Sequence, residues 1–162
     1  MTPPNPAIKE SAPIKESAPP FVELLRVPGA GLPGRATEAQ VAAALEDVVD
    51  PCSVAQGTPL SLPAMGLVRG WRQDPDGVLT LDVCVTAPGC TFVGIFADAA
   101  ARALAGLPGV REVAVRLDPG VLWTEGALRD DARTTLRAAR ESGRPDRPAR
   151  PAVVPVALRR PA

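Results

Sequence analysis

Apolar residues recur at helical spacing along three stretches of the chain. The first follows a capping box at residues 37–40 and has apolar positions at Val41, Ala44, Leu45, Val48 and Val49. The pattern predicts a helix that ends at Asp50-Pro51, because a proline disfavours helical backbone in the residue before it. A weaker stripe predicts a last helix over about residues 124–141. Between them, a third helix is predicted whose buried face would carry Phe92, Ile95, Phe96, Ala99, Ala103 and Leu104.

Alternating apolar and polar residues predict three strands. The first covers residues 67–72, and a turn at residues 73–77 leads into the second, at residues 78–86. The third covers residues 113–117. In the second strand, one face would carry Leu79, Leu81, Val83 and Val85, and the other Thr80, Asp82, Cys84 and Thr86.

The predicted elements follow the order α-β-β-α-β plus a C-terminal helix. The first two strands form an antiparallel hairpin, whereas the third follows a helical crossover and is expected to run parallel to the second. Helices packed on one face of a small mixed sheet are the natural closure of this order. The sequence therefore predicts an α+β fold, built as a two-layer sandwich.

Proline content divides the 162-residue chain into a domain and two tails. Residues 1–36 hold eight of the 20 prolines and a tandem repeat, Ile8–Pro13 and Ile14–Pro19, in which Ile-Lys-Glu-Ser-Ala-Pro occurs twice. Such sequence buries too little to offset chain entropy, so we predict a disordered tail, with docking as the alternative role. The predicted divisions are a tail at 1–36, a domain at 37–141 and a Pro/Arg-rich tail at 142–162.

The formal charge of zero hides an acidic domain and a basic end. Residues 37–128 carry five basic and eleven acidic residues, and residues 129–162 carry nine arginines and four acids. Nucleic acid is an unlikely partner because no aromatic residues are interleaved with these arginines. No stretch approaches the length of a membrane span, and no signal peptide is recognisable, so a cytoplasmic protein is expected. The chain has no histidine, which excludes a Ser-His-Asp triad and an imidazole base.

Cys90 is the first candidate for chemistry. It lies in Thr86-Ala-Pro-Gly-Cys90, between the end of a strand and the start of a helix. Unpaired N–H groups at a helix start favour a thiolate, the form of cysteine that binds metal or attacks an electrophile. Gly89 would let the backbone approach closely, and Thr86 would supply a hydroxyl. The alternative is a small buried cysteine at a tight turn.

Asp50-Pro51-Cys52 is the second candidate. An aspartate at the end of a helix is not favoured by the helix dipole, so another interaction is expected to hold Asp50. The alternative is an ordinary helix stop. Cys52 is either a second thiolate ligand or a residue without a role. Cys84 lies within a strand and is expected to be a packing residue.

Five short segments together resemble a known family. They are Asp50-Pro51, Met65-Gly66-Leu67-Val68, Thr86-Ala-Pro-Gly-Cys90, Leu107-Pro-Gly-Val110 and Trp123. Over residues 37–135 the chain resembles the small iron–sulfur assembly domain of PaaD-like, SufT-like and eukaryotic cytosolic targeting factors. The resemblance implies a compact α+β domain and a role in maturing iron–sulfur or other metalloproteins. It also implies that Cys90 is the functional cysteine, with Asp50 and Thr86 beside it.

Three departures from the family pattern bear on function. Cys52 stands where the family usually has an acidic residue, Leu122 stands where proline is frequent, and the extra C-terminal cysteines of PaaD-like proteins are absent. A phenylacetyl-CoA oxygenase is therefore a doubtful client.

The leading hypothesis is a non-catalytic accessory factor that acts through Cys90 on a client metalloprotein or with the assembly machinery. It would hold an iron–sulfur cluster or iron transiently, with Cys90 and Cys52 as ligands. A cluster takes four ligands, so two chains related by a two-fold axis would complete it as a homodimer. The alternatives are a thiol-dependent redox or transfer enzyme with Cys90 as nucleophile and a non-catalytic interaction module.

Overall fold

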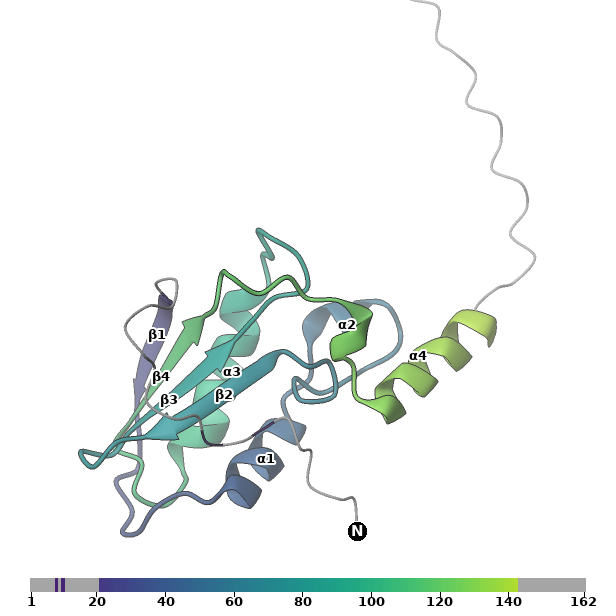
Figure 1. Ribbon diagram of the computed structural model, residues 1–162. Coiled ribbons are helices and arrows are strands. Elements are labelled where there is room, and N and C mark those ends of the chain that lie inside the picture. Colours follow the sequence, from purple (N-terminus) through teal and green to yellow (C-terminus); the bar gives the residue numbers. More distant parts are fainter. Residues whose placement is uncertain (1–7, 9, 11–20, 143–162) are drawn as a thin grey trace, which may run out of the picture.

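A four-stranded mixed sheet forms one layer of the fold (Figure 1). The computed structural model describes residues 8, 10 and 21–142. The strand order is β1-β4-β3-β2; β3 and β4 are parallel, and the other two pairs are antiparallel. The strands are β1 (Val22–Pro28), β2 (Val68–Gln73), β3 (Val78–Val83) and β4 (Glu112–Leu117). The sequence-based prediction of an α+β two-layer sandwich with a mixed sheet is confirmed.

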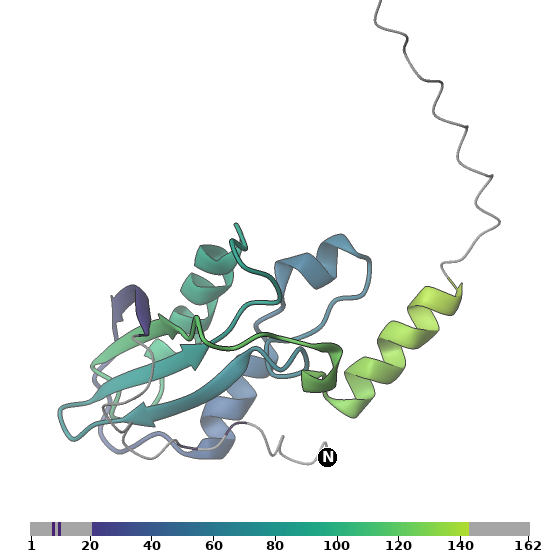
Figure 2. The same cartoon turned by 45° about the horizontal axis from the view of Figure 1, so that its top comes forward.

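Helices cover one face of the sheet. α3 packs against β1 and β4, and α1 packs against α3. After β4 the chain passes along the ends of the strands to α4, which projects away from the sheet (Figure 2). The helices are α1 (Glu38–Glu46), α2 (Pro51–Ala55), α3 (Val93–Ala105) and α4 (Asp130–Ser142), with a 3-10 turn, η1 (Glu125–Ala127), before α4.

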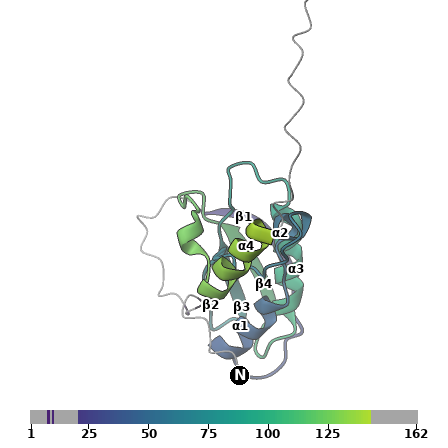
Figure 3. The ribbon, with the colours of Figure 1, turned by 90° about the vertical axis from the view of Figure 1, so that its right-hand side faces the viewer.

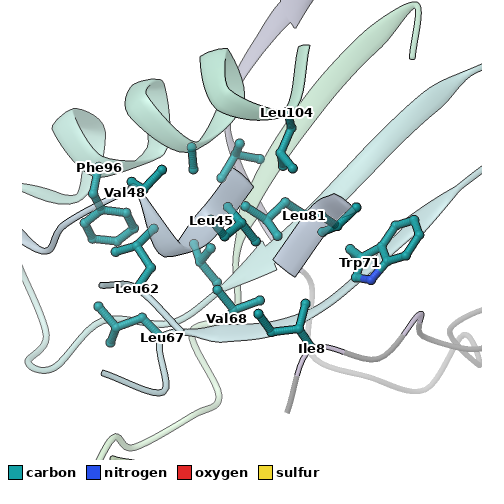
Figure 4. Packing of buried hydrophobic residues seen from close by; sticks show 14 of the residues in the cluster. Ile8, Leu45, Val48, Leu62, Leu67, Val68, Trp71, Leu81, Phe96 and Leu104 are labelled. Atoms are coloured by element: carbon teal, nitrogen blue, oxygen red, sulfur yellow. The ribbon is translucent and has the colours of Figure 1, made fainter. Parts of the chain in front are cut away.

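The core lies between the helices and the sheet. Paired residues on neighbouring strands contribute to this core: Trp71 of β2 is opposite Leu81 of β3, and Leu81 is opposite Val115 of β4. These side chains meet α1 and α3 residues in a single buried cluster, part of which Figure 4 shows. The predicted capping box of α1 is also present, because the Thr37 hydroxyl accepts from the Gln40 N–H and the Gln40 side chain accepts from the Thr37 N–H.

The prediction of a tail over residues 1–36 is wrong for β1. Leu25 pairs with Val115 and Val27 with Val113, so this proline-containing segment buries apolar surface against β4. Pro28 is tolerated because it ends an outer strand, where its missing N–H breaks no ladder. The predicted tails over 1–7, 9, 11–20 and 143–162 lie outside the described residues.

Asp50-Pro51 begins a helix and does not end one. α1 ends at Glu46, and Pro51 is the first residue of α2, where its fixed φ suits a helix start and its missing N–H costs nothing. The Asp50 side chain caps α2 by accepting from the Ser53 N–H at 2.8 Å. The interaction expected to hold Asp50 is therefore an N-cap.

The second face of β3 is also buried. Asp82 is held by Arg116, whose Nε and Nη2 donate to its two carboxylate oxygens at 2.8 and 2.9 Å, and Arg72 lies 3.6 Å away. The Arg116 guanidinium in turn lies 4.3 Å from the centre of the Phe21 ring. One face of β3 is therefore apolar. The other face carries Asp82, which is buried and paired with arginines and is not exposed to solvent.

Candidate functional site

Cys52 and Cys90 lie together where α2 and α3 begin. Cys52 is the second residue of α2, and Cys90 precedes α3 by three residues. Both side chains are half-buried, both are free thiols, and they lie close enough for Cys90 to raise the pKa of Cys52. Figure 1 shows α2 and the start of α3 at the same end of the sheet, and Figure 3 views the molecule from that side. The fold thus unites two cysteines that are far apart in the chain.

The surroundings of Cys52 favour its protonated form. Burial raises the pKa of the Cys52 thiol, and the Asp50 carboxylate and Cys90 raise this pKa further. Cys52 therefore keeps its proton at neutral pH. A metal that binds both sulfurs must displace this proton.

Asp50 acts on the pair through charge and through helix capping. Its side chain is buried, and its Oδ2 is occupied by the Ser53 N–H. The Ser53 hydroxyl donates to the Asp50 carbonyl at 2.7 Å and accepts from the Leu60 N–H at 2.9 Å. This network fixes the first turn of α2 and, with it, the position of Cys52.

Thr86 and Gly89 belong to the turn that leads to Cys90. Both line a groove of about 340 Å³ between residues 85–89 and 117–123. Gly89 has a φ of +74°, and a Cβ at this position would meet no atom within 4 Å. No other part of the described chain approaches Gly89 closely, and glycine is favoured here because of the left-handed conformation.

Cys84 is separate from the pair, as predicted. It is buried in the core, its Sγ lies 3.8 Å from the Gly66 carbonyl oxygen, and burial raises its pKa. These observations confirm a packing role.

Three large apolar side chains that follow the two cysteines in the chain are exposed. Phe92 and Ile95, at the start of α3, are 42% and 58% exposed, and Val54 of α2 is 52% exposed. The prediction that Phe92 and Ile95 face the core is wrong. The buried stripe of α3 is instead Phe96, Ala97, Ala100, Ala101 and Leu104. Small alanines allow α3 to approach the sheet, and the larger side chains of the first turn remain outside.

The cysteine pair alone is an incomplete metal site. In the described part of the chain, no three His, Cys, Asp or Glu side chains group in a way that could hold a metal ion. The pair offers two sulfurs, and Asp50 is occupied by its cap. Any iron or cluster carried here needs more ligands than the described residues group at this place.

Other residues of the segments that resemble the family stabilise the loops around the sheet, which we call the frame. The Trp123 indole N–H donates to the Met65 carbonyl at 2.7 Å. Gly66 has a φ of +69°, and a Cβ there would lie 2.1 Å from the Ala127 carbonyl oxygen. These contacts lock the segment after β4 against the loop before β2.

Comparison with known proteins identifies the family. The family described as iron–sulfur cluster assembly protein matches residues 38–116, from the start of α1 nearly to the end of β4. The Fe-S protein maturation auxiliary factor YitW of Bacillus subtilis (strain 168) is 30% identical over 101 residues, which are 62% of this chain and 94% of that protein. The chain therefore belongs to the iron–sulfur cluster assembly protein family, and the predicted resemblance is confirmed. Family and relative both point to iron–sulfur protein maturation.

A solved structure supports the fold. The crystal structure of a domain of unknown function, DUF59, from Bacillus anthracis superimposes with a TM-score of 0.54 at 23% sequence identity. The match covers 61% of this chain and 90% of that chain. Among the described residues, no helix has the length and apolar character needed to cross a membrane.

Proposed function

We propose that this chain is a non-catalytic auxiliary factor in iron–sulfur protein maturation, and that it acts on its client through Cys90 and Cys52. The observation that carries the proposal is that Cys52, at the start of α2, and Cys90, in the turn before α3, are both free, half-buried and close enough for Cys90 to act on the pKa of Cys52. The family and the relative support the process, and the pair supplies the chemistry. Iron or a cluster is the cargo in this proposal.

Exposed apolar residues support contact with a protein partner. Val54 follows Cys52 by two residues, Phe92 and Ile95 follow Cys90 by two and five residues, and all three are large apolar side chains left in solvent. Exposed apolar groups gathered at one place are typical of interaction surfaces. A client that covers these residues would exclude water from the thiols during transfer.

The number of ligands supports transient binding. Two sulfurs from each chain leave a cluster two ligands short, and a second chain or a client would provide the rest. A homodimer with four sulfurs is one such arrangement, and a client that contributes its own cysteines is the other. In both, the cargo is released when the partner leaves.

Anaerobic reconstitution with ferrous iron and sulfide tests the proposal. Wild type, Cys52→Ser, Cys84→Ser and Cys90→Ser are compared by size-exclusion chromatography with iron analysis and visible absorbance. We expect Cys84→Ser to bind iron like wild type and the other two variants to lose iron. Iron retained by a monomeric Cys52→Ser protein would contradict the shared role of the pair.

Client activation in cells tests the role of Cys90 directly. Cys90→Ser should keep the melting temperature nearly unchanged, because the side chain lies at a half-buried junction outside the core, and should abolish activation. Cys84→Ser is the matched control, with activation retained. A fully active Cys90→Ser variant would refute the proposal, and loss of folding would make Cys90 structural.

A further inference from the structure

The outer edge of β2 is occupied by the N-terminal segment. β2 pairs with β3 on one side and is the last named strand of the sheet on the other. Glu10 forms a parallel bridge with Trp71 there, and Ile8 is only 2% exposed. Figure 4 shows Ile8 on the same side of the core as Val68 and Trp71, both of β2. An outer strand presents backbone groups with which an extended peptide can pair.

The contacts define what this edge recognises. Ile8 enters the hydrophobic core, and the Glu10 carboxylate forms an ion pair with Arg35. Arg35 is itself positioned, because its Nη1 donates to the Gln73 carbonyl at 2.8 Å. The Glu10 N–H also donates to the Glu38 carboxylate at 3.3 Å. These contacts suit an extended segment with isoleucine and, two residues later, glutamate.

The chain contains this pattern twice. Residues 8–13 and residues 14–19 have the same sequence, Ile-Lys-Glu-Ser-Ala-Pro. Ile14 and Glu16 repeat the chemistry of Ile8 and Glu10. The second copy lies outside the described residues, but an identical peptide has the same side chains to offer to the same edge.

Chain length favours the first copy on its own sheet. Across the sheet, the segment at the edge of β2 lies four strand spacings from β1. Along the strands, Trp71 aligns with Val115 of β4 and Val22 with Leu117, an offset of two residues. Together, these two displacements separate Glu10 from Val22 by about 20 Å. Twelve residue steps join Glu10 to Val22 and can span about 40 Å. Only six join Glu16 to Val22, and they span about 20 Å when fully extended. The linker after the second copy would have to be fully extended along a straight path for this copy to reach the edge of β2 in its own chain.

We propose that the edge of β2 is a docking site for Ile-x-Glu segments, and that residues 14–19 dock on this edge in a second copy of the chain. The first copy closes the edge within its own chain, where its effective concentration is high. The second copy can bind only to another molecule whose first copy has been released. The repeat thus provides both a cover and a ligand for one site.

Selective opening of the edge tests this proposal. Ile8→Asp places a charge where the core needs an apolar side chain, so this variant should expose its edge and keep a functional second copy. In iron-free, reducing buffer, we expect Ile8→Asp to form dimers whose fraction rises with protein concentration. Wild type, Ile14→Asp and the double variant should remain monomeric in sedimentation velocity. The absence of iron removes dimers that a cluster would bridge.

A synthetic hexapeptide, Ile-Lys-Glu-Ser-Ala-Pro, gives a second measurement. Added to the double variant, it should shift tryptophan emission to shorter wavelength as Trp71 is covered again, and a peptide with Asp in place of Ile should not. A monomeric Ile8→Asp variant would overturn the proposal, as would a peptide without effect. If the Asp variants fail to fold, Ile8→Ala and Ile8→Ala/Ile14→Ala replace them, with the same difference expected between single and double variants.

Discussion

Asp50 stabilises the start of α2 and also raises the pKa of Cys52, and substitutions can separate these two effects. Its carboxylate caps α2 through the Ser53 N–H, and its charge raises the pKa of Cys52 in addition to the effect of burial. Asp50→Asn keeps a capping oxygen and removes the charge. Asp50→Ala removes both. The two variants therefore distinguish the structural role of this residue from its effect on the cysteine pair.

The structural effect follows from the cap. Asparagine is about as good an N-cap as aspartate, so Asp50→Asn should change the free energy of unfolding by less than about 0.5 kcal/mol. In Asp50→Ala the Ser53 N–H, on a buried residue, loses its partner. Loss of a cap together with an unpaired buried donor costs about 1–3 kcal/mol.

The chemical effect has the same direction in both variants. Without the carboxylate charge the Cys52 thiolate is less disfavoured, so the pKa of Cys52 should fall. The assay is alkylation by iodoacetamide as a function of pH, with Cys52 resolved by peptide mass spectrometry, alongside urea unfolding. We expect the Cys52 alkylation profile to move to lower pH in both variants, and stability to fall only in Asp50→Ala.

Two results would refute this reasoning. An unchanged Cys52 profile in Asp50→Asn would mean that the carboxylate does not act on the thiol. Equal stability of Asp50→Asn and Asp50→Ala would mean that the Ser53 contact does not stabilise α2.

Two further predictions concern the frame and the thiols. Gly66→Ala should cost at least about 2 kcal/mol more than Gly57→Ala in urea unfolding, because both have left-handed φ but only the first new Cβ meets backbone, at Ala127; equal losses would contradict this. Burial raises the pKa of Cys52 and Cys84, so the unfolded state loses these protons more readily and the free energy of unfolding should fall from about pH 8.5 upward. The chain has no tyrosine, so guanidinium unfolding across pH 8–10 reports mainly on thiols, and a flat profile would count against burial as the cause.

Most elements could be predicted because their sequence pattern and their environment agree. β3 alternates cleanly, and the turn before it contains Asp, Pro and Gly, so the hairpin was evident from the chain alone. β1 could not be predicted, because its apolar residues are flanked by prolines and only its pairing with β4, about 90 residues away, makes it a strand. Asp50-Pro51 suits both the end of one helix and the start of the next, and local sequence does not separate these readings.

The candidate site was predicted in part for the same reason. Cys52 and Cys90 were selected because each adjoins the end of a predicted element, and the fold places both junctions at one end of the sheet. The exposure of Phe92 and Ile95 was missed, because an apolar stripe along a helix is normally its buried face. The alanines of α3 were the available signal, since a run of small residues marks the side that approaches the sheet most closely.

Several of the segments that resemble the family have a structural role, because they fix the path of the loops. Gly66 and Trp123 fix the path of the chain after β4, and Gly109 does the same beside α3, where its N–H donates to the Leu32 carbonyl at 2.7 Å and a Cβ would meet the Gly34 carbonyl oxygen at 2.1 Å. These positions fix the path of the loops in this chain. The family match therefore identifies the frame and the process more directly than the client.

The groups that would distinguish clients lie elsewhere, on the surface around the pair. The resemblance leads us to expect an acidic residue where this chain has Cys52, whose protonated thiol changes both the ligand set and the charge near Cys90. Phe92 and Ile95 add an apolar contact surface beside it. Because none of these three residues supports the core, they can vary without loss of the fold. Specificity for a client is therefore expected to reside in them, and exchange of Cys52 for serine, which brings no charge beside Asp50, should alter cargo handling while leaving stability nearly unchanged.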